Sequence, residues 1–239
     1  MPPTPVLHTP RLALRPVRSK DAPVIQRRFP RWEIVRWLDA TVPWPYPADG
    51  AATYVAGCLE EMSRGEKSHW AIIPKSGPAD LIGVISLWPD DGFSRSQRGF
   101  WLDPEFQGRG LMSEAAERIT AYAFNKLGWE HLWLTNAQEN HGSRRIKERQ
   151  GARLVDLLIA DYVEGRGSQM VWLLMRKDWA VRQAACEREG RRLRRRPSFL
   201  KCRAAISPPR ALLPRSGPAD PRRRRRRPES PGRVARRWP

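Results

Sequence analysis

WLDPEFQGRGLMSEAA, residues 101–116, decides the fold of this 239-residue chain. A short apolar run leads into a turn that contains Gly108 and Gly110, and a helical pattern begins at Leu111. The two glycines permit positive φ angles, so consecutive backbone N–H groups can point into one concavity. Because a helix N-terminus also carries positive partial charge, the turn is predicted to bind a pyrophosphate, with Arg109 adding a full charge.

Apolar residues continue at helical spacing beyond the turn, and Gly128 supplies a stop, which predicts a helix over residues 111–127. Two glycines alone are equally consistent with a plain strand-to-helix turn. A P-loop is excluded because no Gly-Lys-Ser/Thr follows the turn. A dinucleotide fingerprint is excluded because Ser113 stands where its third glycine would be.

Residues 107–112 resemble the Gln/Arg-x-x-Gly-x-Gly/Ala motif of the GNAT acetyltransferases, with Met112 departing at the last position. Further on, residues 140–151 are similar to the Asn-x-x-Ser-x-Arg segment of the Rim-type subgroup, which includes ribosomal-protein N-terminal acetyltransferases. Residues 9–16 resemble the first strand of that subgroup. The resemblance covers about residues 7–179. It implies an α/β (α+β) fold with a central mixed, mostly antiparallel sheet, flanked by helices and splayed at a β-α-β acetyl-CoA site.

The resemblance also assigns roles to site residues. The backbone N–H of Leu102 would donate to the thioester oxygen, and Ser143 would protonate the leaving thiolate unless it only caps its helix. Asn140 would hold the pantetheine arm or merely terminate its strand. No metal is required. The expected contacts of acetyl-CoA are Leu102, Asp103, Gln107, Gly108, Arg109, Gly110, Leu111, Met112, Ser113, Asn140, Ser143 and Arg145.

The general base does not follow from the resemblance. Many relatives place a glutamate where this chain has Gln97, and the tyrosine of many other GNAT helices would be Lys147. Asp103, Glu139 and His141 are alternative bases, each also typical of a solvated loop. A water chain would suffice for a peptide α-amine, which titrates near neutrality.

Composition predicts a domain over residues 1–179 and an Arg/Pro-rich tail over residues 180–239. The tail holds 20 of the 44 Lys and Arg but only 4 of the 25 Asp and Glu, so it carries +16 of the net charge of +19. This composition predicts disorder, and the arginine run 222–227 predicts non-specific contact with nucleic acid. A solvated, self-repelling tail or an extended reading frame would give the same composition.

Patterning predicts strands at residues 69–73, 81–87, 98–102 and 131–135, the last parallel to its predecessor, and helices at 49–65 and 144–150. An aromatic loop at residues 30–47 is expected to cover a pocket or the core. Cysteines without metal-ligand spacing indicate a reducing compartment, and the longest clean apolar run, 171–175, is too short to cross a bilayer. We therefore expect a cytoplasmic protein without a membrane partner.

The expected activity is transfer of an acetyl group from acetyl-CoA to a primary amine, either a protein N-terminus or a small molecule. The alternative from another class is a catalytically silent module that binds acyl-CoA or associates with nucleic acid. The missing glutamate and the arginine tail favour that alternative.

Overall fold

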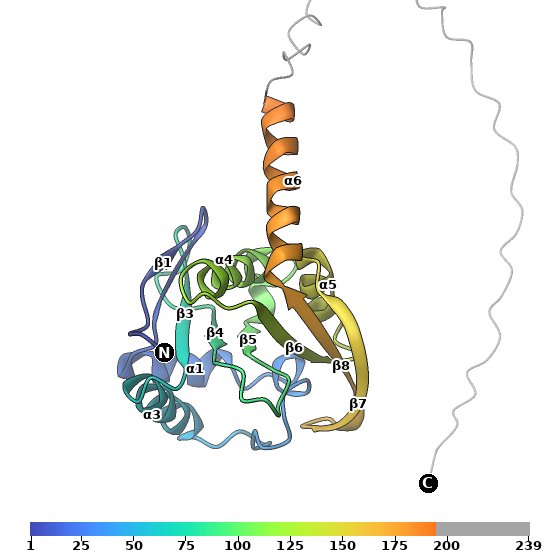
Figure 1. The fold of residues 1–239 in the computed structure, drawn as a ribbon. Coiled ribbons are helices and arrows are strands. Elements are labelled where there is room, and N and C mark those ends of the chain that lie inside the picture. Colours follow the sequence, from blue (N-terminus) through green and yellow to red (C-terminus); the bar gives the residue numbers. More distant parts are fainter. Residues whose placement is uncertain (195–239) are drawn as a thin grey trace, which may run out of the picture. The chain divides into compact units, whose positions relative to one another are not determined.

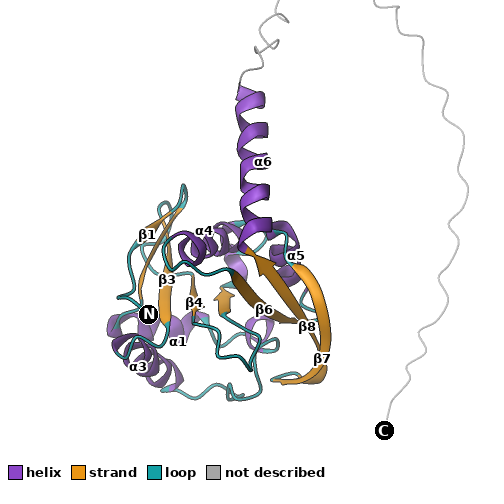
Figure 2. Cartoon of the chain, viewed as in Figure 1, coloured by secondary structure: helices purple, strands orange, loops and turns teal. Residues whose placement is uncertain are grey.

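The computed structural model describes residues 1–194, which contain two antiparallel sheets (Figures 1 and 2). In spatial order the first sheet consists of β1 (Leu7–His8), β2 (Leu12–Pro16), β3 (Ser68–Pro74), β4 (Gly83–Leu87) and β5 (Arg98–Leu102). The second consists of β6 (His131–Ala137), β8 (Gly165–Met175) and β7 (Arg153–Tyr162). The predicted strands are confirmed, and β5 has the predicted bounds.

The helices expected at residues 49–65, 111–127 and 144–150 are present. Residues 32–35, within the segment expected as a loop, and residues 176–194, which extend into the predicted tail, are also helical. Helices thus accompany the strands along the described residues. They are α1 (Ala22–Arg28), α2 (Trp32–Val35), α3 (Gly50–Ser63), α4 (Leu111–Asn125), α5 (His141–Gln150) and α6 (Arg176–Arg194). The helix α5 begins three residues before its predicted start because Asn140, and not a later residue, caps it. None of the helices within residues 1–194 has both the length and the apolar character that a bilayer crossing requires.

Side-chain alternation in the first sheet separates two apolar layers. In β5 the side chain of Leu102 joins a core cluster with α4, whereas the neighbouring Trp101 joins a second cluster with α1 and α3. In β3, Ile72 and Ala71 divide in the same way. Helix α4 therefore covers one face of the first sheet, and α1 and α3 cover the other (Figure 1).

The two sheets meet at Gln97, directly before β5. Its backbone N–H donates to the carbonyl of Trp133 in β6 at 2.9 Å, and its side-chain Oε1 accepts from the N–H of Trp133 at 2.8 Å. Beyond this point β5 and β6 share no strand ladder within the described residues, so the predicted mixed sheet is present as two sheets joined at one end. The predicted splay between the two strands is therefore wide enough to end the pairing.

The aromatic segment at residues 30–47 reaches from α1 to the second sheet. The N–H of Ala40 donates to the carbonyl of Asp161 at 3.1 Å, and the N–H of Val163 donates to Leu38 at 3.0 Å. Trp32 and Trp44 remain partly exposed, with ring centroids 5.6 Å apart. The segment therefore ties the β7–β8 hairpin to the first half of the chain; a role as the cover of a pocket stays a prediction.

Helix α6 crosses the predicted domain boundary at residue 179. The ring of Trp179 packs against Phe124 at 5.4 Å, and its Nε1 donates to Glu117 at 2.6 Å. Gln183 donates to the same carboxylate at 2.5 Å, so the beginning of α6 belongs to the folded unit. Residues 195–239, with the arginine run 222–227, lie outside the described residues, and the predicted tail stays a prediction.

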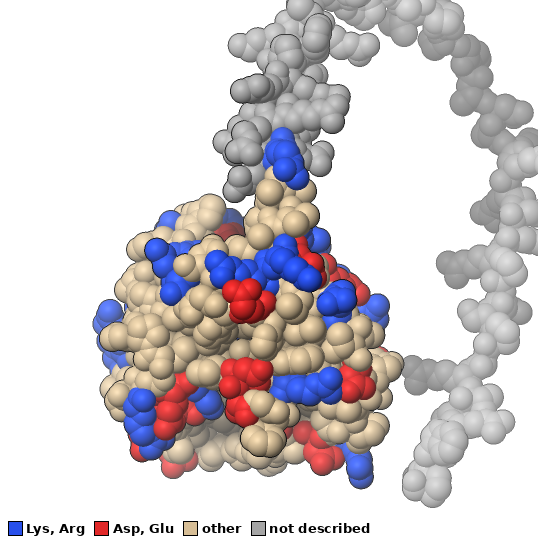
Figure 3. Space-filling model, viewed as in Figure 1, with Lys and Arg blue, Asp and Glu red and all other residues tan. Residues whose placement is uncertain are grey.

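Charges of both signs are interspersed on the face that Figure 3 draws. This distribution agrees with the near balance of charge that the sequence assigns to residues 1–179. Cys58 on α3 is a free cysteine buried in the second core cluster.

We expect Gln97→Ala to destabilise the protein by about 1–3 kcal/mol, because it leaves the N–H of Trp133 without its acceptor in a nearly dry junction. The Gln97 side chain is only 2% exposed. Gln138→Ala, which truncates an exposed amide, is the matched control and should change stability by less than about 0.5 kcal/mol. Urea unfolding of the two variants measures both values, and equal stabilities would contradict the proposed junction.

Candidate active site

The gap between β5 and β6 exposes backbone groups of β5. The N–H of Asp103 donates to Ile82 of β4 at 2.9 Å, so by antiparallel alternation the polar groups of Leu102 point the opposite way, into the gap. The Leu102 carbonyl accepts from Gln107 Nε2 at 2.9 Å. By the same alternation its N–H also points into the gap, and its role as the oxyanion donor stays a prediction.

The glycine turn has the backbone that its sequence predicts. Gly108 and Gly110 have φ angles of 73° and 74°, in the left-handed region that favours glycine. Gly110 is the N-cap of α4, and its carbonyl accepts the first helical bond, from Glu114 at 3.1 Å. The N–H groups of the first helical turn are therefore available to an anion.

Met112 departs from the family motif without disturbing this turn. Its side chain is buried in the core cluster beneath α4, together with that of Leu111. The backbone N–H groups of both residues lie in the first turn of the helix, where binding would use them. Ser113, the third residue of that turn, is half-buried.

Arg11 fixes the turn from the neighbouring end of β2. Its Nη1 donates to the carbonyl of Arg109 at 2.9 Å, and its Nε lies 2.6 Å from a carboxylate oxygen of Glu114. The guanidinium of Arg109 lies 5.5 Å from the ring centre of Phe106. Sequence reasoning missed Arg11 as a site residue, although it lies in the segment that resembles the subgroup's first strand.

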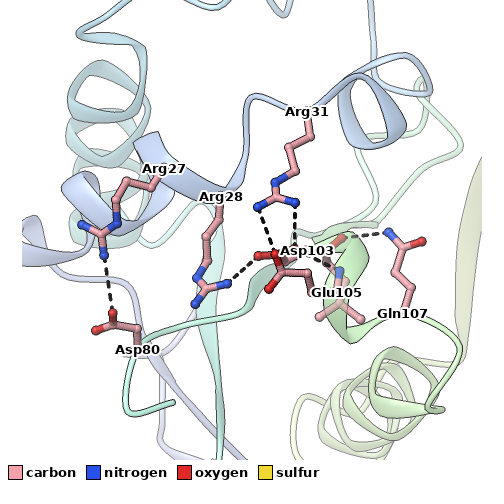
Figure 4. A network of polar contacts seen from close by, with 8 residues as sticks. Arg27, Arg28, Arg31, Asp80, Asp103, Glu105 and Gln107 are labelled. Carbon is pink, nitrogen blue, oxygen red and sulfur yellow. Dashed lines mark hydrogen bonds and ion pairs between the residues drawn. The ribbon is translucent and has the colours of Figure 1, made fainter. Parts of the chain in front are cut away.

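Asp103 is fully buried in a network with two arginines, Arg28 at the end of α1 and Arg31 at the N-cap of α2 (Figure 4). Arg28 Nη1 lies 2.5 Å from Asp103 Oδ2, and Arg31 Nη1 lies 3.8 Å from Oδ1. Asp103 Oδ1 also accepts from the N–H of Glu105 at 3.1 Å. With both oxygens engaged and its N–H bound to β4, Asp103 positions the end of β5 and is poorly placed to act as a base.

The sequence left open whether Ser143 caps its helix or acts as an acid, and the contacts of Asn140 and Ser143 show which residue is the cap. Asn140 Oδ1 accepts from the N–H of Ser143 at 3.0 Å, so Asn140 caps α5 and the Ser143 hydroxyl does not. The hydroxyl instead accepts from Lys147 Nζ at 2.8 Å. Ser143 is thus held by a neighbour one helical turn away, and its role as an acid stays a prediction.

Lys147 lies beside a second buried cation, Arg98. Arg98 donates to Thr120 at 2.9 Å and to Gln150 at 2.8 Å, and burial lowers the pKa of Arg98 to about 10, which leaves it charged at neutral pH. Burial, and then the charge of Arg98, lowers the pKa of Lys147 well below its usual value. Of the two cations, Lys147 therefore has the stronger tendency to lose its proton.

The other predicted site residues lie at the surface. Arg145, Glu139 and His141 are exposed around the start of α5. The part of the chain that the structure describes contains no group of three or more His, Cys, Asp or Glu side chains that could hold a metal ion.

The comparisons with known proteins agree with this geometry. The "Acetyltransferase (GNAT) domain" family matches residues 11–153. The Bacillus subtilis protein named "Putative ribosomal N-acetyltransferase YdaF" is 31% identical over 105 residues, which cover 41% of this chain and 56% of that protein. The chain thus spans little more than half the length of this curated relative.

Two solved structures show the same fold over most of their length. Mycobacterium smegmatis RimJ in complex with CoA-disulfide has a TM-score of 0.64 and 21% identity, over 77% of this chain and 94% of that chain. The ribosomal L7/L12 alpha-N-protein acetyltransferase RimL in complex with coenzyme A has a TM-score of 0.61 and 17% identity, over 72% and 98%.

The positive φ of Gly110 generates a prediction with an internal control. Gly110→Ala should destabilise the protein by about 1–2 kcal/mol, because an L side chain is strained at this φ although its Cβ would meet only Arg11 Nη2 at 3.6 Å. Gly57→Ala, in the middle of α3 with open space around the Cβ, should stabilise it by about 0.5–1 kcal/mol. Thermal unfolding measures the two opposite shifts, and shifts of one sign would contradict the left-handed turn.

Proposed function

The chain belongs to the GNAT acetyltransferase family, and we propose that it transfers the acetyl group of acetyl-CoA to a primary amine. One observation carries the proposal: by strand alternation the N–H of Leu102 faces the gap between β5 and β6, six residues before the first glycine of the turn. An oxyanion donor and an anion site are thereby held on one short, rigid segment.

The residues around the gap fit acetyl-CoA as a co-substrate. The N-terminus of α4, the turn at Gly108 and Gly110, and the charge of Arg109 suit its pyrophosphate. The open edge of β5 suits the amides of its pantetheine arm, which would replace the missing strand partner. Leu102 N–H would then stabilise the negative charge that develops on the thioester oxygen.

The proposal assigns to Ser143 the proton that the leaving thiolate takes up. Its hydroxyl belongs to α5, whose residue Lys147 lies over the ring of Phe100 in β5, with 5.7 Å from Nζ to the ring centre. The hydroxyl is therefore held on the side of β5 that carries Leu102 and Phe100. Proton donation at this point would complete acetyl transfer without a metal.

We infer that the acceptor is the α-amine of a protein N-terminus. The side chains of Gln97 and Asp103 are both engaged in structural contacts and are not free to act as a base. An α-amine needs less help from a base than a lysine does, because its pKa lies near neutrality and a larger fraction of it is already unprotonated. The names of two similar proteins support this inference, because YdaF is named a putative ribosomal N-acetyltransferase and RimL a ribosomal L7/L12 alpha-N-protein acetyltransferase. A small-molecule amine is the alternative that the same assay tests.

The assay combines calorimetric titration with acetyl-CoA and thiol release against peptides with free N-termini and a panel of small amines. Gly108→Asp and Gly108→Asn form a matched pair, because both residues tolerate positive φ and no atom lies within 4 Å of the added Cβ. We expect Gly108→Asn to bind acetyl-CoA within a few-fold of the wild-type protein. Gly108→Asp should bind about tenfold more weakly or worse, because its carboxylate faces the pyrophosphate.

Equal affinities of the Asp and Asn variants would contradict the pyrophosphate site. Binding of acetyl-CoA without thiol release over the whole panel would contradict the proposed transfer and favour a silent acyl-CoA-binding module. Release with small amines but with no peptide would reassign the acceptor.

The arginine run 222–227 generates a separate prediction about nucleic acid. The full chain should bind single-stranded RNA with an affinity that falls steeply as salt rises, because phosphate contacts release counterions. A protein that ends at residue 194 should lose this binding. Acetyl-CoA affinity should be unchanged, since α6 keeps its contacts with Glu117. RNA affinity that is equal in both proteins at each salt concentration would remove the nucleic-acid role of the tail.

A further inference from the structure

Lys147 is a buried amine with a single polar side-chain partner among the described residues. Its side chain is 2% exposed, and its Nζ donates to Ser143 Oγ at 2.8 Å. The ring of Phe100 lies beneath it, with 5.7 Å from Nζ to the ring centre. Phe100 and Leu102 lie on the same side of β5, so the amine and the Ser143 hydroxyl lie on the side of β5 that carries Leu102.

The charged groups around Lys147 disfavour its ammonium form. Arg98 of β5 is the cation that faces it, and no carboxylate lies within ion-pair distance of Nζ in residues 1–194. The carboxylate of Glu117 in α4 acts on Arg98, and its oxygens accept from Gln150, Trp179 and Gln183. On α5 itself, Arg144 and Glu148 pair with each other at the surface.

An unpaired buried ammonium costs several kcal/mol, whereas a neutral amine costs far less and carries a lone pair. A neutral Lys147 can therefore both donate to Ser143 and accept its proton. No other buried group in contact with Ser143 has this capacity within the described residues.

We propose that Lys147 holds the proton that is in transit during acetyl transfer and exchanges it through Ser143 Oγ. This inference rests on the proposed function. Lys147 touches no substrate atom in this scheme, so it is a positioning residue, and Ser143 is the group that meets the reacting atoms.

The proposed steps balance in atoms and charge. The acceptor nitrogen attacks the thioester carbon, and the resulting N–H proton passes to Ser143 Oγ while the Ser143 proton passes to Lys147 Nζ. The C–S bond then breaks, and the thiolate takes the proton of Ser143, which Lys147 replaces. The amide and the free thiol leave, and Lys147 is neutral again without any further reactant.

The kinetic test uses the full chain and compares Lys147→Met, Lys147→Arg and Ser143→Ala. Lys147→Met should lower kcat about 100-fold with little change in acetyl-CoA affinity, in the range expected for loss of proton transfer. Lys147→Arg should be equally slow, because a guanidinium keeps its proton although it can still donate to Ser143. Lys126→Met, at an exposed lysine, is the control that should keep the wild-type rate.

The pH profile and the double variant separate a proton role from a structural one. In the wild-type protein kcat should fall as the pH drops through the lowered pKa of Lys147, because the protonated amine accepts no further proton. Lys147→Met should lose this inflection. Ser143→Ala combined with Lys147→Met should be no slower than Ser143→Ala alone, because the two residues act in one chain.

A second measurement does not depend on the acceptor. NMR titration of protein labelled at the lysine Cε carbons should show one signal, absent from Lys147→Met, that titrates well below the other lysines. A Lys147 signal with an ordinary lysine pKa would overturn the inference, whether or not an acceptor had been found.

The outcomes distinguish the two proposals. If the wild-type protein and Lys147→Arg release thiol at the same rate, the role of Lys147 is overturned and the proposed function remains intact. Wild-type protein that releases no thiol with any acceptor would contradict the proposed function, and the NMR titration would still decide the charge of Lys147.

Discussion

The structure depends on one unpaired edge of β5. Antiparallel pairing with β4 satisfies half of its backbone groups, and a continuous sheet would satisfy the others through β6. The pairing ends at Gln97 and Trp133, and both ends of β5 are then fixed independently: Gln97 holds the beginning, and the ion pair of Asp103 with Arg28 holds the end. Because a fixed strand cannot close the gap, its open N–H groups favour a ligand that supplies amide acceptors.

The electrostatics of the site follow from the same gap. Arg98 points from β5 towards α4 and α5, where Thr120 and Gln150 satisfy its Nη groups. Lys147 enters the same region from α5 with only a hydroxyl to bind. Burial disfavours the charged form of both side chains, and the guanidinium, with its higher intrinsic pKa and its two hydrogen-bond partners, keeps its charge more readily than the amine. Burial beside Arg98 thus favours the neutral form of the Lys147 amine, as the proposed proton transfer requires.

Much of this arrangement could be predicted from the sequence, because its signals are local. The bounds of β5, the glycine turn, the stripe of α4 and the buried Met112 follow from periodicity and from the conformational freedom of Gly108 and Gly110. The long-range contacts could not be predicted. Arg11 meets the turn across nearly a hundred residues, and the spacing of Ser143 and Lys147 shows that they are neighbours on a helix without showing that β5 buries them.

Gln97 connects these points. The family resemblance places a glutamate at this position in many relatives, where a carboxylate can accept a proton. In this chain the amide oxygen of Gln97 accepts a hydrogen bond from the N–H of Trp133, and the side chain is nearly inaccessible to solvent. Gln97 therefore joins the two sheets. With glutamine in place of glutamate, the attacking amine still needs a group that accepts its proton. On α5 lie a hydroxyl and an amine whose pKa is lowered by burial and then by the charge of Arg98, and in the proposed scheme these two groups move a proton between the acceptor nitrogen and the thiolate without a carboxylate.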